Sequence, residues 1–512
     1  MSVNSSPPPR IAPLPVAGLS NIIRTAGITG GSTLFAQAAG YLMVFALTLS
    51  LGVGGFGLFS LATTVMGITT LVATLGLDVT VVRFAAWYRG RGETPKLEAL
   101  LFFVMAFVLA WSVVVAAGLW GLAPFLSVKL FREPELISLM RIASVGLPLN
   151  ALFAIFISGL HGCGLTTRRV YAEQIILPAS RLVFIIVAGA AKASVQAALW
   201  AMVAAACLSM VIAGWWLARE GRFWKSSLVG LPDLKAWTKY ATPAFLDSLL
   251  VTPLGGSLEI FFLGMFGTKE MVAVYSVVLR FKFIVSLPMT AFNTTLAPLI
   301  SEAHARLDRG RLKELYSSAT RWIMMLSLPL VAVNVLFGGL LLGLFGQAYT
   351  LGYTTLALMI LGQLVNVCVG PVGHMLLMTG YSRIRLFNSL VLLATQLGLG
   401  LLLIPVWRLE GAGGVSAVST AIVSLLGLIE VAALLKIHPY QRDLVKPLLA
   451  CCATAGVIAL GQSVWGKTWI AESLLLIGFV MAYVGVLMGL GLSPDDKQLV
   501  LQAKNRLAAG RL

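Results

Sequence analysis

The sequence predicts an all-α polytopic membrane protein of about fourteen transmembrane helices, arranged as two pseudo-symmetric six-helix bundles and a terminal helix pair. Three observations predict this fold class. The composition is too apolar for a soluble surface, fourteen apolar runs have the length of a membrane span, and Lys and Arg lie mostly on one side of the resulting topology.

The composition excludes a soluble protein. Hydrophobic residues make up 58% of the chain, charged residues 11%, and the mean hydropathy is +0.92. Soluble domains carry roughly 25% charged residues because their surfaces must stay hydrated. The net charge of +17 would suit a nucleic-acid partner. However, the basic residues lie in short segments between apolar runs, so we expect membrane lipids as the surroundings and no nucleic-acid binding.

No pattern of an enzyme or a metal site is present. The five cysteines lie in or beside apolar runs without zinc-ligand spacing, and the four histidines are scattered. No Gly-rich phosphate loop follows a strand, and every outer loop is short. We therefore expect no metal, no cofactor and no enzymatic activity, and the short loops disfavour a membrane-embedded glycan polymerase or ligase. An ion gradient, the substrate gradient or another protein would have to supply any energy.

Apolar runs of spanning length cover most of the chain. A helix that crosses a bilayer needs roughly twenty mostly apolar residues. The runs lie near 25–50, 56–82, 98–122, 136–160, 170–190, 194–217, 240–264, 271–299, 320–345, 352–378, 386–406, 413–436, 446–465 and 470–491.

The charge distribution tests this count independently. With the N-terminus in the cytoplasm, 27 of the 37 Lys and Arg residues fall in cytoplasmic segments, six in outer loops and four inside spans. One missed or invented helix would scramble such a bias. The sequence therefore predicts fourteen spans with both termini in the cytoplasm.

Two pairs of short segments recur at the same offset. Gly57-Leu58-Phe59 matches Ala273-Val274-Tyr275, and the turn 164–169 matches the turn 380–385, each 216 residues apart. This offset predicts two six-helix halves in the same orientation, with a substrate cavity between them. The predicted divisions are a disordered tail 1–20, an N-terminal bundle 21–218, a cytoplasmic linker 219–239, a C-terminal bundle 240–437, a helix pair 438–492 and a basic cytoplasmic tail 493–512.

Four cations inside spans are candidate substrate-binding residues. Arg181, Arg280 and Lys282 lie about 15 Å deep, where a charge costs a few kcal/mol unless it faces protein or water. Arginine binds phosphate bidentately, so these residues favour an anionic headgroup. Residues two apart on a helix face different directions, so at most one of Arg280 and Lys282 points squarely inward. Arg141 is only one turn inside its span, where it can snorkel instead. Pairing with a carboxylate or snorkelling to an interface is the alternative for these cations.

Candidate ion-coupling or gating residues lie in the second and seventh spans. Asp78 is five residues before Arg83, and a structural ion pair at the inner mouth is the interpretation we favour. Asp247 is the better candidate for a proton or cation site. Pro243 and Pro253 remove backbone donors from the seventh span, which predicts a hinge or lateral gate, with a packing kink as the alternative.

Several short motifs resemble the Wzx-type polysaccharide flippases of the MOP superfamily, which also holds the MATE multidrug exporters and the MurJ lipid II flippase. The motifs are Leu51-Gly52 with Phe59-Ser60-Leu61-Ala62, Leu75-Gly76-Leu77-Asp78, Val82-Arg83-Phe84-Ala85-Ala86, Gly162-Cys163-Gly164 with Arg168 and Arg169, and the second-half copy Gly380 to Arg385. The resemblance covers nearly the whole chain and identifies the superfamily better than the member.

The resemblance implies a function. A Wzx-type protein would form a V of two bundles around a basic cavity and flip an undecaprenyl-pyrophosphate-linked oligosaccharide to the outer leaflet of a bacterial inner membrane. The product would serve lipopolysaccharide, other surface polysaccharide or exopolysaccharide assembly, with a polymerase and a chain-length regulator as partners. The alternatives are a proton- or cation-coupled exporter of small amphiphiles and a lipid II flippase. The first span carries no acid, which disfavours MATE-like export, and Arg24 lies only at its inner end, which weakens the lipid II alternative.

Overall fold

The computed structural model describes residues 16–190, 194–220, 237–238, 240–242, 245, 257–465 and 469–489. Within these ranges every regular element is a helix. Those of the first half are α1 (Val16–Thr74), α2 (Leu77–Gly90), α3 (Thr94–Pro124), the π-helix η1 (Phe125–Leu130), α4 (Leu136–Gly162), α5 (Thr166–Val170), the π-helix η2 (Tyr171–Ile176), α6 (Leu177–Ala190) and α7 (Val195–Glu220).

The second half and the terminal helices continue the same pattern. They are α9 (Ser257–Phe266), α10 (Lys269–Ala305), α11 (Arg309–Leu336), α12 (Gly338–Gly343), the 3-10 helix η4 (Gln347–Gly352), α13 (Tyr353–Val369), α14 (Val372–Met378), α15 (Ser382–Leu435), the 3-10 helix η5 (Arg442–Leu444), α16 (Val445–Trp465) and α17 (Trp469–Gly489). The prediction of an all-α membrane fold is confirmed: ten of the described helices are long and apolar enough to cross a bilayer.

Two of these helices are too long for one crossing. Gly31–Thr74 of α1 has 44 residues and α15 has 54, or about 66 Å and 81 Å at 1.5 Å per residue, against roughly 30 Å of hydrocarbon. Each is interrupted by one non-helical residue, Gly52 (φ 67°) in α1 and Arg408 (φ 46°) in α15. Each therefore supplies two crossings. The exact count of fourteen stays a prediction.

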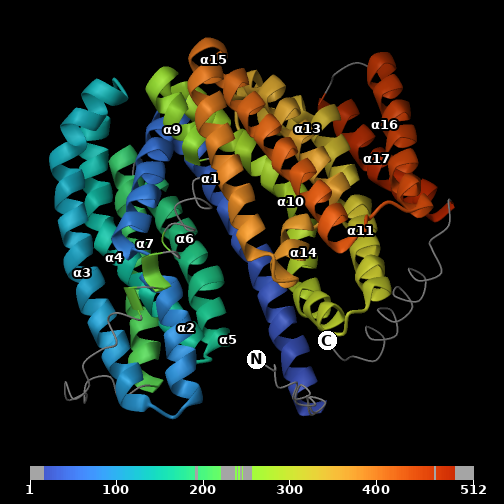
Figure 1. Cartoon of the computed structure of the whole chain (residues 1–512). Helices are drawn as coiled ribbons and strands as arrows, with labels where there is room; N and C mark the ends of the chain where they lie inside the picture. The colour runs from blue at the N-terminus through green and yellow to red at the C-terminus, as the bar shows by residue number, and fades with distance from the viewer. Residues whose placement is uncertain are drawn as a thin grey trace.

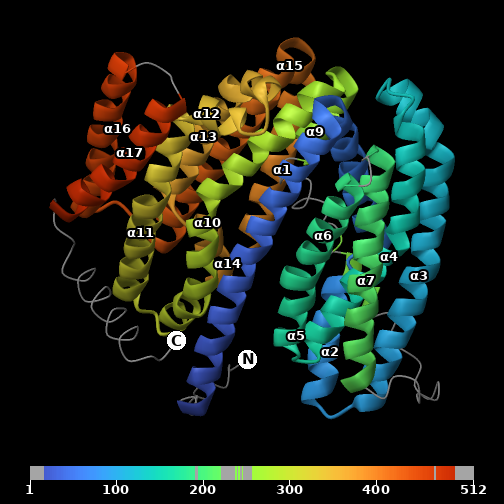
Figure 2. The ribbon, with the colours of Figure 1, turned by 180° about the vertical axis from the view of Figure 1, so that it is seen from behind.

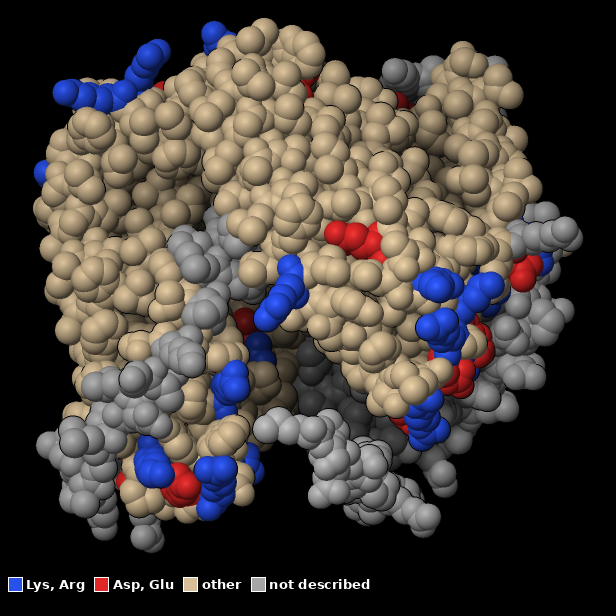
Figure 3. Space-filling model, in the orientation of Figure 1, with Lys and Arg blue, Asp and Glu red and all other residues tan. Residues whose placement is uncertain are grey.

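The helices form two groups that meet at one end and separate toward the other (Figures 1 and 2). α2 to α7 make up one group and α10 to α15 the other, while α16 and α17 pack beside α11. The N-terminal part of α1 lies at the separated end, which we call the open end. On the face drawn in Figure 3, most Lys and Arg gather at the open end, and the molecule is hollowed between the two groups there.

The first part of α1 does not stay within its own group. It packs along α10 of the second half. The ring of Phe45 also meets that of Phe345, between α12 and η4, edge to face with centroids 5.7 Å apart. The start of the seventh span makes the reciprocal exchange, because a Cβ on Gly76 at the head of α2 would lie 2.8 Å from the carbonyl oxygen of Ala241. Just before it, Trp237 at the end of the predicted linker donates from Nε1 to Tyr88 Oη of α2 at 3.2 Å. One segment of each half therefore lies against the other half.

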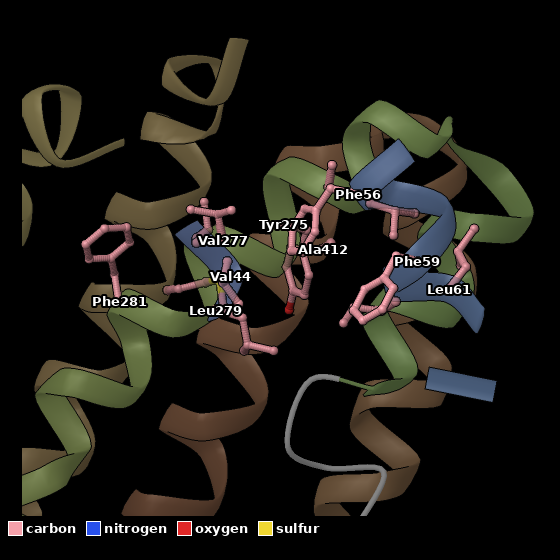
Figure 4. Packing of buried hydrophobic residues seen from close by; sticks show 14 of the residues in the cluster. Val44, Phe56, Phe59, Leu61, Tyr275, Val277, Leu279, Phe281 and Ala412 are labelled. Atoms are coloured by element: carbon pink, nitrogen blue, oxygen red, sulfur yellow. The ribbon is translucent and has the colours of Figure 1, made fainter. Parts of the chain in front are cut away.

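A shared hydrophobic core closes the end opposite the N-terminus, which we call the closed end. Figure 4 shows Phe56, Phe59 and Leu61 of α1 near Tyr275 of α10 and Ala412 of α15. The halves approach so closely that a Cβ on Gly57 would lie 1.8 Å from the carbonyl oxygen of Lys269. Glycine is needed there because its missing side chain lets the two backbones meet.

An ionic contact also joins the halves at the closed end. Lys269 Nζ, at the start of α10, lies 3.2 Å from a carboxylate oxygen of Glu133 and 3.7 Å from one of Glu135. Both acids lie between η1 and α4 of the first half. The observed conformation is therefore sealed at one end and open at the other.

Candidate functional site

Arg181 and Arg280 come together from opposite halves. Arg181 lies in α6 and Arg280 in α10, both half-buried, and their guanidinium groups are close enough to repel each other. Neither forms an ion pair with a carboxylate in the described part of the chain. Arg181 Nε is buried and has no hydrogen-bond partner among the described residues. The two cations, which we call the arginine pair, leave a positive site without a matching charge.

The first part of α1 forms one wall of this site. Arg280 Nη1 lies 3.9 Å from where a Cβ of Gly40 would stand, so the small residue leaves room for the guanidinium. The neighbouring Tyr41 Oη donates to the backbone carbonyl of Arg280. α1 is thereby held against α10 beside the arginine pair.

The same wall is tied to the first half through a π-helix. Ser32 Oγ and Thr33 Oγ1 of α1 donate to Gln174 Oε1 at 2.7 and 2.9 Å. Gln174 belongs to η2, which directly precedes the helix that carries Arg181. π-helical turns widen a helix and are frequent at functional sites. Tyr41 and Gln174 were not among the residues predicted from the sequence. A polar side chain within an apolar run is the pattern that could have indicated them.

Lys282 lies in a different environment from Arg280. Its Nζ donates to Ser416 Oγ at 2.8 Å and is near enough to Glu259 for an electrostatic attraction. Glu259 is only 1% exposed and accepts a hydrogen bond from Gln396 Nε2 at 3.1 Å. Lys282 therefore belongs to a buried polar cluster inside the second half, whereas Arg280 faces α1. The two-residue spacing separates them as expected.

Arg141 lies apart from the arginine pair. Its guanidinium stacks over the ring of Trp120 in α3, 5.3 Å from the centroid. α3 lies at the edge of the molecule, away from the second half (Figures 1 and 2). Arg141 therefore has the peripheral placement that its shallow position allowed.

The expected ion pair between Asp78 and Arg83 does not form. The chain leaves the helix at Leu75 and Gly76, both with positive φ, so Asp78 lies in the first turn of a new helix, α2. Asp78 Oδ1 is buried without a hydrogen-bond partner in the described residues. Arg83 stacks instead over the ring of Tyr240, 4.3 Å from the centroid. The helix break places Asp78 in the first turn of a new helix. Tyr240, which follows Trp237 in the chain, gives Arg83 an aromatic ring to stack on instead of a carboxylate.

The remaining candidates, Asp247, Pro243 and Pro253, lie outside the described residues. Their coupling and hinge roles stay predictions. No group of three or more His, Cys, Asp or Glu side chains in the described ranges is arranged to hold a metal ion.

Two helical halves around a charged site, sealed at one end, are the arrangement of a membrane transporter. The family pattern described as "Polysaccharide biosynthesis protein" matches residues 22–304, more than half of the chain. The chain therefore belongs to this family, a flippase family within the MOP superfamily. A second pattern, MatE, matches residues 243–402.

Solved structures show the same fold. A MATE-family multidrug resistance transporter in its inward-facing conformation is 18% identical, with a TM-score of 0.64, and the match covers 78% of this chain and 94% of that one. The lipid II flippase MurJ, in an inward closed conformation, is 12% identical, with a TM-score of 0.70 and coverage of 90% and 97%. A MOP-superfamily transporter from Pyrococcus furiosus is 17% identical, with a TM-score of 0.57 and coverage of 80% and 95%. No curated protein matches the sequence.

Proposed function

We propose that this protein flips a polyprenyl-pyrophosphate-linked oligosaccharide from the inner to the outer leaflet of a bacterial inner membrane. The arginine pair carries the proposal. Two like charges near the middle of the bilayer, without a carboxylate partner in the described residues, are costly until an anion neutralises both. A pyrophosphate supplies two adjacent anionic groups, and each guanidinium can bind one bidentately.

Because the two arginines belong to different halves, binding of the headgroup would be coupled to a movement of the halves. Because one arginine comes from each half, a bound pyrophosphate removes the repulsion that otherwise opposes their approach. The open end would then close around the headgroup, while the hydrophobic core at the closed end would separate. The polyprenyl chain stays in lipid throughout.

The orientation follows from charge. Lys and Arg gather at the open end on the face shown in Figure 3, and the positive-inside rule places such an end in the cytoplasm. The open end would therefore load substrate from the inner leaflet, with both termini in the cytoplasm. A polysaccharide polymerase and a chain-length regulator would receive the product.

Two other substrates have support among the comparisons. The likeness to MurJ supports lipid II, and the likeness to MATE transporters supports export of a small amphiphile coupled to protons or cations. The arginine pair favours an anionic headgroup over a cationic drug. Lipid II carries a pyrophosphate as well, so it has to be separated by experiment.

The test is a leaflet assay in proteoliposomes of the purified full-length protein. We expect labelled undecaprenyl-pyrophosphate oligosaccharide, including the glycan of the source cell, to cross at least tenfold faster than in empty vesicles. Lipid II and a lipophilic cationic dye serve as competing substrates. Equal rates with and without protein for the oligosaccharide would reject the proposal, and selective movement of lipid II or of the dye would assign the alternative.

A further inference from the structure

A cavity of about 440 Å³ lies inside the second half, separate from the arginine pair. Its polar lining comes from four helices: Asn293 of α10, Asn366 of α13, His374 of α14, and Arg385, Asn388 and Ser424 of α15. We call it the amide chamber. Its volume lies within the range of ordinary small-ligand sites, about 300–1,000 Å³.

The chamber lies on the face of α10 that also carries Lys282. Asn293 follows Lys282 by eleven residues, which is three helical turns, so both point the same way about 16 Å apart. Arg280 faces another direction, toward α1. α14, which contributes His374, lies in the part of the second half that flanks α1 in both views (Figures 1 and 2). The chamber therefore includes a helix on the side of the second half that faces α1.

Two acceptors in the chamber have no donor. Asn388 is 7% exposed, and its Nδ2 donates to Glu430 Oε2. A carboxylate only accepts hydrogen bonds, so this contact identifies Nδ2 as the atom that faces Glu430 and leaves Oδ1 as the free end of the amide. Asn388 Oδ1 and Asn293 Oδ1 are both buried without a hydrogen-bond partner in the described part of the chain. Each such buried group is unfavourable until it is satisfied.

Donors without a charged acceptor also belong to the lining of the chamber. Asn366 Nδ2 meets only the sulfur of Met289, at 3.7 Å. Arg385 forms no ion pair with a carboxylate of the described residues and lies near His374. The lining of the chamber thus offers two unsatisfied acceptors together with donors of hydrogen bonds.

The presence of both acceptors and donors in the chamber favours one class of ligand. A phosphate brings acceptors and would leave both asparagine oxygens unsatisfied. A purely apolar group would satisfy neither kind of atom. A sugar hydroxyl donates one hydrogen bond and accepts others, so several hydroxyls on one ring can meet both kinds at once.

We propose that the amide chamber binds a sugar residue of the transported glycan through hydroxyl hydrogen bonds to Asn293, Asn388 and their neighbours. This inference rests on the proposed function, because it places the sugar of the same substrate whose pyrophosphate meets the arginine pair. It adds a second recognition element, which separates glycan selection from headgroup binding.

The experiment compares two lipids bound to full-length protein in nanodiscs: undecaprenyl pyrophosphate without sugar, and the same lipid carrying a neutral trisaccharide from a panel of hexoses and N-acetylhexosamines. We expect at least one glycosylated lipid to bind about tenfold tighter than the bare one. Asn388→Leu and Asn293→Leu should each remove that gain and leave the affinity for bare lipid unchanged. Asn334→Leu is the matched control, since Asn334 is also buried with an unpartnered Oδ1 but does not line the chamber.

The outcomes separate the two proposals. Equal affinity of the wild type for bare and glycosylated lipids across the panel, or a gain that survives in both asparagine variants, overturns the sugar site and leaves a water-filled cavity. Failure to bind even bare undecaprenyl pyrophosphate rejects the proposed function instead. In that case saturation-transfer NMR with the soluble trisaccharides tests whether the chamber binds sugar. Saturation-transfer signals that the wild type gives and Asn293→Leu loses support the sugar site, and the absence of signals in the wild type rejects it.

Discussion

Arg181 in α6 and Arg280 in α10, 99 positions apart in the chain and from opposite halves, lie close enough for their guanidinium groups to repel each other. Uncompensated like charges at this depth reduce stability, so their presence requires a reason other than folding.

Removing either arginine should separate activity from stability. We expect Arg181→Ala and Arg280→Ala each to lower the flipping rate at least tenfold, because one half of the headgroup contact is lost. The apparent Tm should stay equal or rise, because an unpaired buried charge is removed. Flipping assays and thermal unfolding measure both quantities.

Arg141→Ala is the control for that pair, since Arg141 stacks on Trp120 away from the site. It should flip at close to the wild-type rate. Wild-type rates in both Arg181→Ala and Arg280→Ala would remove the cationic site as the basis of transport.

Lys269 and Glu133 should hold the closed end. Both side chains are about one quarter exposed, so we expect Lys269→Gln to weaken closure by about 1 kcal/mol, or roughly fivefold in population. Alkylation of Leu61→Cys, buried in the closed-end core, measures the opening. The reversed pair Lys269→Glu with Glu133→Lys should recover most of the closure.

Lys129→Gln controls for the loss of a positive charge at this end, because Lys129 lies over Phe125 rather than beside an acid. If it accelerates alkylation as much as Lys269→Gln does, the ionic contact is not what holds the end closed.

Gly57→Ala should prevent the closed end from sealing. Its Cβ would stand 1.8 Å from the carbonyl oxygen of Lys269, and backbone cannot move aside as a flexible side chain can. We expect faster alkylation of Leu61→Cys and a large loss of flipping. Gly67→Ala, on the same helix with nothing within 4 Å, should change neither. Normal sealing in Gly57→Ala would show that the two backbones are farther apart in the membrane.

Glu259 and Lys282 should stabilise the second half only as a pair. Glu259→Gln or Lys282→Met alone leaves one buried charge without its counterpart, and we expect a loss of about 3 kcal/mol in the free energy of unfolding. The double variant should recover much of that loss. Thermal unfolding of the four proteins forms a double-mutant cycle, and additive losses would show that the two charges do not interact.

The depth of a charge could be predicted from the sequence, but its partners could not. Counting residues along the spans gives Arg181 and Arg280 a predicted depth near the middle of the membrane because the rise per residue is fixed. Lys282 looked equivalent to Arg280, yet its partner Ser416 is 134 positions away and belongs to a helix that only the packing brings near. Asp78 and Arg83 looked paired because they are close in sequence, but the break at Gly76 and the ring of Tyr240 separated them.

The sequence by itself determined that this protein lies in a membrane as two similar helical halves with cations at depth. A span of about twenty consecutive apolar residues is enough to favour lipid over water, so the sequence pattern that predicts a membrane helix is local. Only the tertiary structure decided that α1 crosses to the second half, that the arginine pair forms between the halves, and that an amide chamber lies within one of them. Those relationships depend on which helix faces pack together, and contacts across about a hundred residues or more leave no periodic trace in the chain.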